Sequence, residues 1–164
     1  MNTRRSFLLN SLTAAGSGMA VAMLGGRAFA DRSYEVAHTD AEWRKILSPE
    51  AYEVMRHQGT ERSGSSPIAD TMNKGIYDCA GCALPLFSSA TKFHSGTGWP
   101  SFYKPLSNAV LTTTDNSWIM ERTEVHCRRC GGHLGHVFDD GPPPTGLRYC
   151  MNGVALKFMP DKTA

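Results

Sequence analysis

The five cysteines are the residues whose type and spacing most directly indicate chemistry. Four of them form two CxxC motifs, Cys79 with Cys82 and Cys127 with Cys130, and the fifth, Cys150, stands apart. A CxxC motif presents two thiolates on a tight turn, and two such motifs supply the four sulfurs of a closed tetrahedral zinc site. Cys150 then remains as an unpaired thiol, whose thiolate form is a nucleophile.

The four paired cysteines have other interpretations. One alternative is a pair of disulfides, since an exported chain meets an oxidising compartment. A disulfide within a CxxC motif, however, closes a tiny loop and stabilises the fold little. An iron site and redox-active cysteine pairs are further alternatives. We expect one Zn²⁺ per chain, and we expect it to be structural because four thiolates leave no open position at which water is activated.

The neighbours of Cys150 favour a reactive thiol. In a strand over 148–152, side-chain alternation places Arg148, Cys150 and Asn152 on one face. A guanidinium beside a thiol favours the thiolate. An inert core cysteine is the alternative, because free cysteines are often buried.

Two other segments supply groups that would complete a reactive site. His133 and His136 offer proton transfer near neutral pH, although hydrogen bonding beside the metal would explain His133 equally well. The Gly-Thr-Gly-Trp-Pro loop holds the indole of Trp99 on a tight turn, which is typical of a recognition surface. Ordinary core packing is the alternative for Trp99.

The elements that must position these residues are short. Thr39 and Glu42 form a capping-box pattern, and Ser48 with Pro49 predicts a second helix that ends at Gly59. Residues 59–74, rich in small polar residues, are expected to form a surface connection. From there on, short alternating or β-branched runs between turn residues predict an antiparallel β domain. The expected strands lie within 76–77, 86–87, 109–111, 117–125, 134–138, 148–152 and 154–158.

Residues 1–30 have the form of a twin-arginine export signal. Arg4 and Arg5 precede an apolar stretch, and a small-x-small pattern ends at Ala30. The stretch is short and interrupted by polar residues, which disfavours a membrane span. We therefore expect export to the periplasm, with an uncleaved anchor as the alternative.

Removal of residues 1–30 would leave one domain, 31–164, with 14 basic and 15 acidic side chains. Such a length suits one compact domain. No clustered basic face remains, so we expect no nucleic-acid partner and no stable membrane association.

The motifs together resemble the B-type methionine sulfoxide reductases, the peptide-methionine (R)-S-oxide reductases. The matching segments are CAGC at 79–82, SGTGWPSF at 95–102, CRRCGGHLGHVF at 127–138, DGPPPTGLRYC at 140–150 and the following Asn152. They occur in the family's order over about residues 38–159. The resemblance implies a mainly β fold of two small antiparallel sheets, with the zinc site on the far side from the active site.

The resemblance also implies a reaction. Cys150 would attack the sulfur of a methionine-R-sulfoxide in an oxidised protein, which leaves methionine and a sulfenic acid on Cys150. His136, with His133 and Asn152, would hold and protonate the departing oxygen.

Further residues follow from the same resemblance. Trp99 would contact the substrate methyl group, Phe102 would line the same pocket, and Arg148 would complete the substrate-binding set. Many relatives have a resolving cysteine where this chain has Thr97, so we expect an external, thioredoxin-like thiol reductant. Gly153 replaces the serine usual in the family.

Two rival functions remain at this point. A non-catalytic, zinc-stabilised β binding module would have an unreactive Cys150. A metal carrier would hold its zinc loosely, whereas a closed structural site is expected to unfold when stripped.

Overall fold

Two short helices begin the part of this computed structural model that is described, residues 34–116 and 121–161. Helix α1, Asp40–Ile46, starts at the predicted capping box, where Glu42 Oε2 accepts from the Thr39 backbone N–H at 2.8 Å. Helix α2, Pro49–His57, starts at Ser48, whose hydroxyl accepts from Ala51 N at 3.2 Å. Both predicted helix starts are confirmed.

The end of α2 differs from the prediction. Gln58, not Gly59, takes the left-handed conformation that ends the helix, with φ at 57°. Gly59 N–H still donates to Glu53 O at 3.1 Å, and an added Cβ would lie 3.0 Å from that same oxygen. Any larger residue there would therefore crowd the last turn of the helix.

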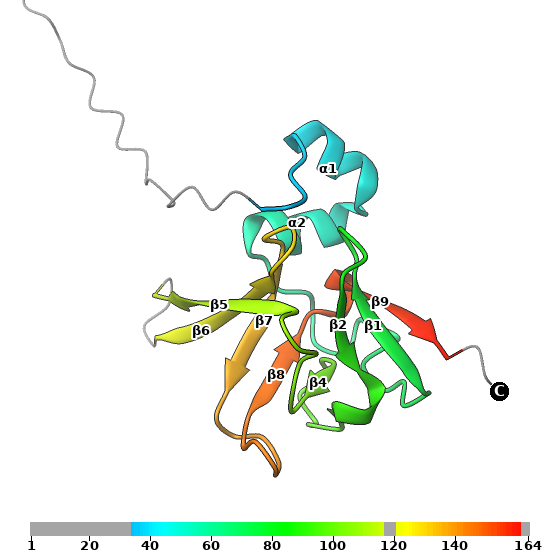
Figure 1. Cartoon of the computed structure of the whole chain (residues 1–164), viewed down its shortest axis with the longest axis vertical. Helices are drawn as coiled ribbons and strands as arrows, with labels where there is room; N and C mark the ends of the chain where they lie inside the picture. The colour runs from blue at the N-terminus through cyan, green and yellow to red at the C-terminus, as the bar shows by residue number, and fades with distance from the viewer. Residues whose placement is uncertain (1–33, 117–120, 162–164) are drawn as a thin grey trace, which may run out of the picture. The chain divides into compact units, whose positions relative to one another are not determined.

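The strands form two antiparallel sheets, as Figure 1 shows. The first sheet has the order β2 (Pro85–Ser88), β1 (Gly75–Cys79), β9 (Leu156–Pro160). The second has the order β3 (Lys92–Phe93), β4 (Ser101–Phe102), β8 (Arg148–Met151), β7 (His133–Phe138), β6 (Arg122–Cys127), β5 (Val110–Asp115). The predicted fold class, mainly β with two antiparallel sheets and short N-terminal helices, is confirmed.

Three local details were not predicted. Strands β3 and β4 have only two residues each, too few for an alternation pattern to be visible. The strand expected over 117–125 has residues 117–120 outside the described part, and β6 begins at Arg122. A 3-10 turn, η2 (Gly153–Ala155), precedes β9 where a continuous strand was expected.

The core joins the two sheets through aromatic rings. Phe102 of β4 stacks on Phe87 of β2 at a centroid distance of 4.4 Å and meets Tyr77 of β1 edge-on at 5.0 Å. Tyr149 and Met151 of β8 pack on the same core. Because side chains alternate along a strand, Cys150 between them faces the other way.

The segment expected to be a surface connection is partly buried. Glu61 and Ser66 are only 3% and 8% exposed, and Ala69 is buried as well. This segment crosses from α2 to β1 over the end of β8 by bonding to the backbone after Met151, so it is a structural part of the domain.

The predicted export signal cannot be compared with the structure. Residues 1–30, with the expected export signal, lie outside the described residues. Within 34–116 and 121–161, no helix has the length and apolar character needed to cross a membrane.

Candidate active site and metal centre

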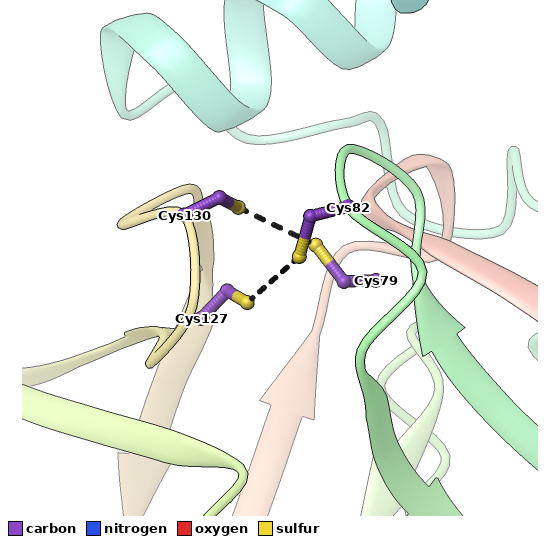
Figure 2. Close-up of side chains that lie close together, drawn as sticks. All are labelled: Cys79, Cys82, Cys127 and Cys130. Carbon is purple, nitrogen blue, oxygen red and sulfur yellow. Dashed lines mark hydrogen bonds between the residues drawn. The ribbon is translucent and has the colours of Figure 1, made fainter. Parts of the chain in front are cut away.

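The four paired cysteines meet between the two sheets, as Figure 2 shows. Cys79 ends β1 and Cys127 ends β6, while Cys82 and Cys130 lie in the turns that follow. Their four sulfur atoms lie within 4.8 Å of one another. Dashed lines in Figure 2 join Cys79 to Cys130, whose sulfurs are 3.7 Å apart, and Cys82 to Cys127, whose sulfurs are 3.5 Å apart.

These distances fit a tetrahedral metal. Four sulfurs at the zinc–sulfur bond length are about 3.8 Å apart, and a disulfide bond is far shorter, about 2.05 Å. None of the described cysteines forms a disulfide. The cluster is therefore positioned to hold a metal ion that joins one sheet to the other.

The two cysteine turns have the same backbone geometry. The residue after each motif, Ala83 or Gly131, has a positive φ of 55° or 68°. Its N–H donates at 2.9 Å to the carbonyl of the first cysteine, Cys79 or Cys127. This repeated turn brings both thiols of each motif to one side, which is why the spacing alone predicts the cluster.

Cys150 lies on a central strand beside a pocket. In the sheet register it is opposite Ser101 of β4 and His136 of β7. The pocket, of about 140 Å³, is lined by Cys150, His136, Asn152 and Trp99 among the predicted residues. Its other lining residues are Thr60, Arg122, Gly135, Phe138 and Met151.

The metal centre and the pocket occupy opposite ends of β6. Cys127 ends this strand and Arg122, which lines the pocket, begins it. Five steps along a strand separate the two backbones by about 17 Å. The cysteine cluster therefore lies apart from the pocket along this strand.

Hydroxyl groups surround the Cys150 sulfur on one side. Thr97 Oγ1 lies 3.9 Å from Cys150 Sγ. Ser95 Oγ is 2.8 Å from Thr97 Oγ1 and 2.8 Å from Ser101 Oγ, so the three hydroxyls form one hydrogen-bonded chain. A thiolate or an oxygen bound to the sulfur would find donors here.

The charge of Arg148 acts on Cys150 less than the sequence suggested. Burial raises the pKa of the Cys150 thiol, while the hydrogen bond with Thr97 and the charge of Arg148 act in the opposite direction and do not overcome it. The guanidinium forms a two-pronged ion pair with Asp140, both distances being 2.8 Å, and lies 4.5 Å from the centroid of the Phe138 ring. Arg148 therefore flanks the pocket instead of lining it.

His136 is the imidazole that lines the pocket. Its Nε2 donates to Asp115 Oδ2 at 2.8 Å, and the same oxygen accepts from Arg122 Nη2 at 2.7 Å. Burial lowers the pKa of His136, and the hydrogen bond with Asp115 only partly opposes this effect. A largely neutral imidazole at neutral pH follows.

His133 lies behind His136. Its Nδ1 is 2.8 Å from Glu124 Oε1, and within the described part of the chain its buried Nε2 has no hydrogen-bond partner. The two imidazole centroids are 5.3 Å apart. His133 is not among the residues that line the pocket.

Trp99 and Asn152 are held by the segment after α2. Trp99 Nε1 donates to Glu61 O at 3.2 Å. Asn152 Oδ1 accepts from Glu61 N at 2.9 Å, and its Nδ2 donates to Leu134 O at 3.1 Å. The side chain of Asn152 thus forms two hydrogen bonds with backbone groups around the pocket.

Phe102 does not join the pocket as the resemblance implied. Its ring is fully buried against Phe87 and Tyr77. The register places Ser101 opposite Cys150, so Ser101 shares the face of the thiol and Phe102 points to the opposite face, into the core.

Comparison with known proteins places these features in a family. The SelR domain model matches residues 47–160. A peptide methionine sulfoxide reductase MsrB of Leptospira interrogans is 52% identical over 130 residues, 79% of this chain and 99% of that protein. The MsrB of Thiobacillus denitrificans is 58% identical over 123 residues, covering 74% of this chain and 93% of that protein.

The chain belongs to the MsrB family. A third relative, the MsrB of Methanosarcina barkeri, is 53% identical over 128 residues, 77% of this chain and 90% of that protein. The resemblance inferred from the motifs is thereby confirmed. The SelR match contains all four clustered cysteines and every residue that lines the pocket.

The departure from the MsrB pattern at Gly153 has a structural explanation. A Cβ added there would overlap the Oγ and Cβ of Ser66. The backbone N–H of Gly153 donates to Glu61 Oε1 at 2.7 Å. Ser66 therefore fills the space that a side chain at position 153 would need.

Several residues at the site were not found from the sequence. Phe138 alternates with His136 along β7, so strand periodicity could have revealed it. Asp115 and Arg122 face each other across the β5–β6 pairing, which depends on a register that the sequence does not display. Glu61 lies in a segment without any periodic pattern.

Proposed function

We propose that this chain reduces methionine-R-sulfoxide in oxidised proteins to methionine, with the Cys150 thiolate as the nucleophile. The observation that supports this most is the pocket itself. It combines the one thiol outside the cysteine cluster with a histidine on the neighbouring strand and an indole on the adjacent loop.

The pocket has an apolar and a polar side that suit a methyl sulfoxide. The rings of Trp99 and Phe138 offer a surface for the methyl group, and His136 with Asn152 offers polar atoms for the oxygen. Because the sulfoxide sulfur is chiral, fixing both the methyl group and the oxygen relative to Cys150 selects one epimer.

The proposed reaction reduces the sulfoxide and oxidises Cys150. The neutral His136 imidazole takes up a proton as the Cys150 thiol ionises, the thiolate attacks the sulfoxide sulfur, and the protonated imidazole then gives its proton to the departing oxygen. This attack forms a bond between Cys150 Sγ and the substrate sulfur, and the substrate S–O bond breaks as the oxygen leaves as water. A water oxygen then bonds to Cys150 Sγ, and the S–S bond breaks with its electron pair on the methionine sulfur. Methionine is thus the reduced product and Cys150 sulfenic acid the oxidised one.

External thiols would regenerate Cys150. A first thiol attacks the sulfenic sulfur, which releases water and forms a mixed disulfide, and a second thiol then releases Cys150. Thr97 contacts Cys150 but has no sulfur, and the other four cysteines form the metal cluster. We therefore propose a thioredoxin-like protein as the reductant.

We propose that the metal is zinc, one ion per chain, held by Cys79, Cys82, Cys127 and Cys130. A four-thiolate tetrahedral donor set is the one that structural zinc prefers. The ion supplies no chemistry to the reaction. Its ligands hold the β1–β2 and β6–β7 turns together, which fixes the two sheets that enclose the core.

We further propose that the protein acts in the periplasm. The support is the twin-arginine pattern and cleavage motif in residues 1–30. Comparing the N-terminal residue of the protein isolated from periplasmic and cytoplasmic fractions tests this. Recovery of the uncleaved chain from the membrane fraction would contradict it.

The function is tested with epimerically pure substrates. Purified residues 31–164 with dithiothreitol should consume methionine-R-sulfoxide and leave the S epimer. Cys150→Ser should abolish turnover, and His136→Gln should reduce it by 10²–10⁴-fold, about what general acid catalysis contributes. His38→Gln, an exposed histidine substitution, is the matched control. Equal consumption of both epimers, or undiminished activity of Cys150→Ser, would refute the mechanism.

A non-catalytic binding module is the second candidate, because burial raises the pKa of Cys150 and so lowers its thiolate fraction. That function predicts that iodoacetamide leaves Cys150 unmodified at neutral pH while the protein stays folded. Alkylation of Cys150 that is blocked by methionine-R-sulfoxide would exclude it.

A further inference from the structure

We propose that Glu61 is a positioning residue that sets the places of Trp99 and Asn152 in the pocket. The inference rests on the proposed function for its effect on turnover. The positioning itself is a property of the fold and has its own measurement.

Glu61 bonds directly to both residues through its backbone. Its N–H donates to Asn152 Oδ1 at 2.9 Å, and its carbonyl accepts from Trp99 Nε1 at 3.2 Å. Trp99 and Asn152 come from different elements, a loop and the end of β8. One peptide group on each side of Glu61 therefore fixes the distance between the indole and the amide.

The Glu61 side chain anchors this arrangement to the start of η2. Oε1 accepts from Gly153 N at 2.7 Å and Oε2 accepts from Val154 N at 3.0 Å. Both partners are donors, so the anchor needs two acceptor atoms, which a carboxylate has and a glutamine amide lacks. Replacing Glu61 with glutamine would set an NH₂ group against a backbone N–H.

The burial of Glu61 indicates a demanding position. The residue is 3% exposed, and no ion pair among the described residues involves it. A buried carboxylate without a cation is costly unless its oxygens are hydrogen-bonded. A residue that served only to fill space here would be apolar.

The residues after Glu61 extend the same attachment along the loop that carries Trp99. Ser63 Oγ donates to Thr97 O at 2.7 Å, and Gly64 N–H donates to Gly98 O at 2.9 Å. Thr60, on the other side of Glu61, lines the pocket. The segment thus brings Thr60 to the pocket and holds the loop that carries Trp99, and the Glu61 carboxylate ties it to η2.

Cys150 itself does not depend on this anchor, because β4 and β7 pair with β8 on both sides. Loss of the anchor should therefore disturb substrate binding and leave the nucleophile in place. That separation distinguishes positioning from general destabilisation.

The test compares Glu61→Gln with Leu86→Val, a cavity-forming change in the buried core of β2 that serves as a stability control. In Glu61→Gln the KM for methionine-R-sulfoxide should rise about tenfold, as expected when a hydrogen bond that orients a substrate contact is lost. The rate of Cys150 alkylation by iodoacetamide should stay within about twofold. Leu86→Val should change neither quantity. Glu61→Ala, which removes both acceptors, should raise the KM further.

A second measurement decides the positioning without using activity. The Trp99 indole N–H resonance, assigned with Trp99→Phe, should shift and exchange with solvent faster in Glu61→Gln but not in Leu86→Val. An unchanged indole resonance and an unchanged KM in Glu61→Gln would overturn the inference. The two proposals can fail separately. If the unaltered protein has no activity but the indole resonance changes in Glu61→Gln, the proposed function is overturned and the positioning is upheld.

Discussion

The substitution Gly153→Ala should destabilise the folded chain because Ser66 already fills the space beside Gly153. An added Cβ would lie far inside 3.0 Å of both side-chain atoms of Ser66 and 3.3 Å from Glu61 Oε1. The backbone of Gly153 is not left-handed, so alanine meets no conformational penalty there. The whole cost is therefore a packing overlap.

The expected magnitude follows from the overlap. Ser66 is 8% exposed and has a short side chain, so it cannot move aside without a backbone shift. Overpacking of this kind costs about 1–3 kcal/mol in the free energy of unfolding. Ser66→Gly removes both overlapping atoms. By itself it should lower the free energy of unfolding by about 0.5–1 kcal/mol, because glycine gives the unfolded chain more conformational freedom.

The assay is a double-mutant cycle by guanidinium unfolding of the zinc-loaded protein. Gly153→Ala combined with Ser66→Gly should be about as stable as Ser66→Gly alone, which gives a favourable coupling of about 1–3 kcal/mol. Ser66→Ala keeps its Cβ and should restore less. Additive effects within about 0.5 kcal/mol would refute the overlap as the cause.

Three further predictions concern the metal, the pH response and the recycling of the thiol. Removal of the metal by a strong chelator, or Cys127→Ser, should abolish the cooperative unfolding transition measured by circular dichroism, because the link between the sheets is lost; a retained transition would contradict this. Because burial lowers the pKa of His136 below 6.5, the unfolded chain binds more protons between the two values, so stability should rise with pH up to about 6.5 and then level off. That rise should shrink in His136→Gln when unfolding midpoints are compared across this range. Thr97→Cys should place a second sulfur beside Cys150 and yield an internal disulfide after one turnover, seen by mass spectrometry as a loss of about two hydrogens; a sulfenic acid trapped equally in both proteins would argue against that proximity.

The sequence predicted the cysteine cluster because the chemistry of that cluster depends on local spacing. A CxxC motif brings its own two thiols together, so two motifs indicate a cluster without knowledge of the fold. The helix starts at Thr39 and Ser48 were predictable in the same way, because a capping side chain bonds within its own turn.

Features that depend on strand register were not predictable. Phe102 was expected in the pocket, but the pairing of Ser101 with Cys150 turns it into the core, and a two-residue strand has no alternation that would reveal this. A bulge in the β6–β7 pairing shifts the register between Val125 and His126 and puts His133 and His136 on one side.

Glu61 was missed for a different reason. It acts mainly through its backbone N–H and carbonyl, which every residue possesses, and its carboxylate bonds to the backbone of η2 some ninety positions away. Neither contact leaves a pattern in residue types. Only the three-dimensional path of the segment after α2 shows why an acidic residue is buried there.

In the proposed reaction, the pairing of β8 on both edges would restrict what kind of thiol can restore Cys150. With Ser101 and His136 alongside it, this residue cannot swing outward to meet a partner. An incoming sulfur would therefore have to enter the pocket, which the indole of Trp99 also lines. Under the proposed mechanism, a small thiol or a thiol on a protruding tip would enter this pocket more easily than a thiol set in a flat protein surface, so access to the pocket would favour some reductants before any redox potential does.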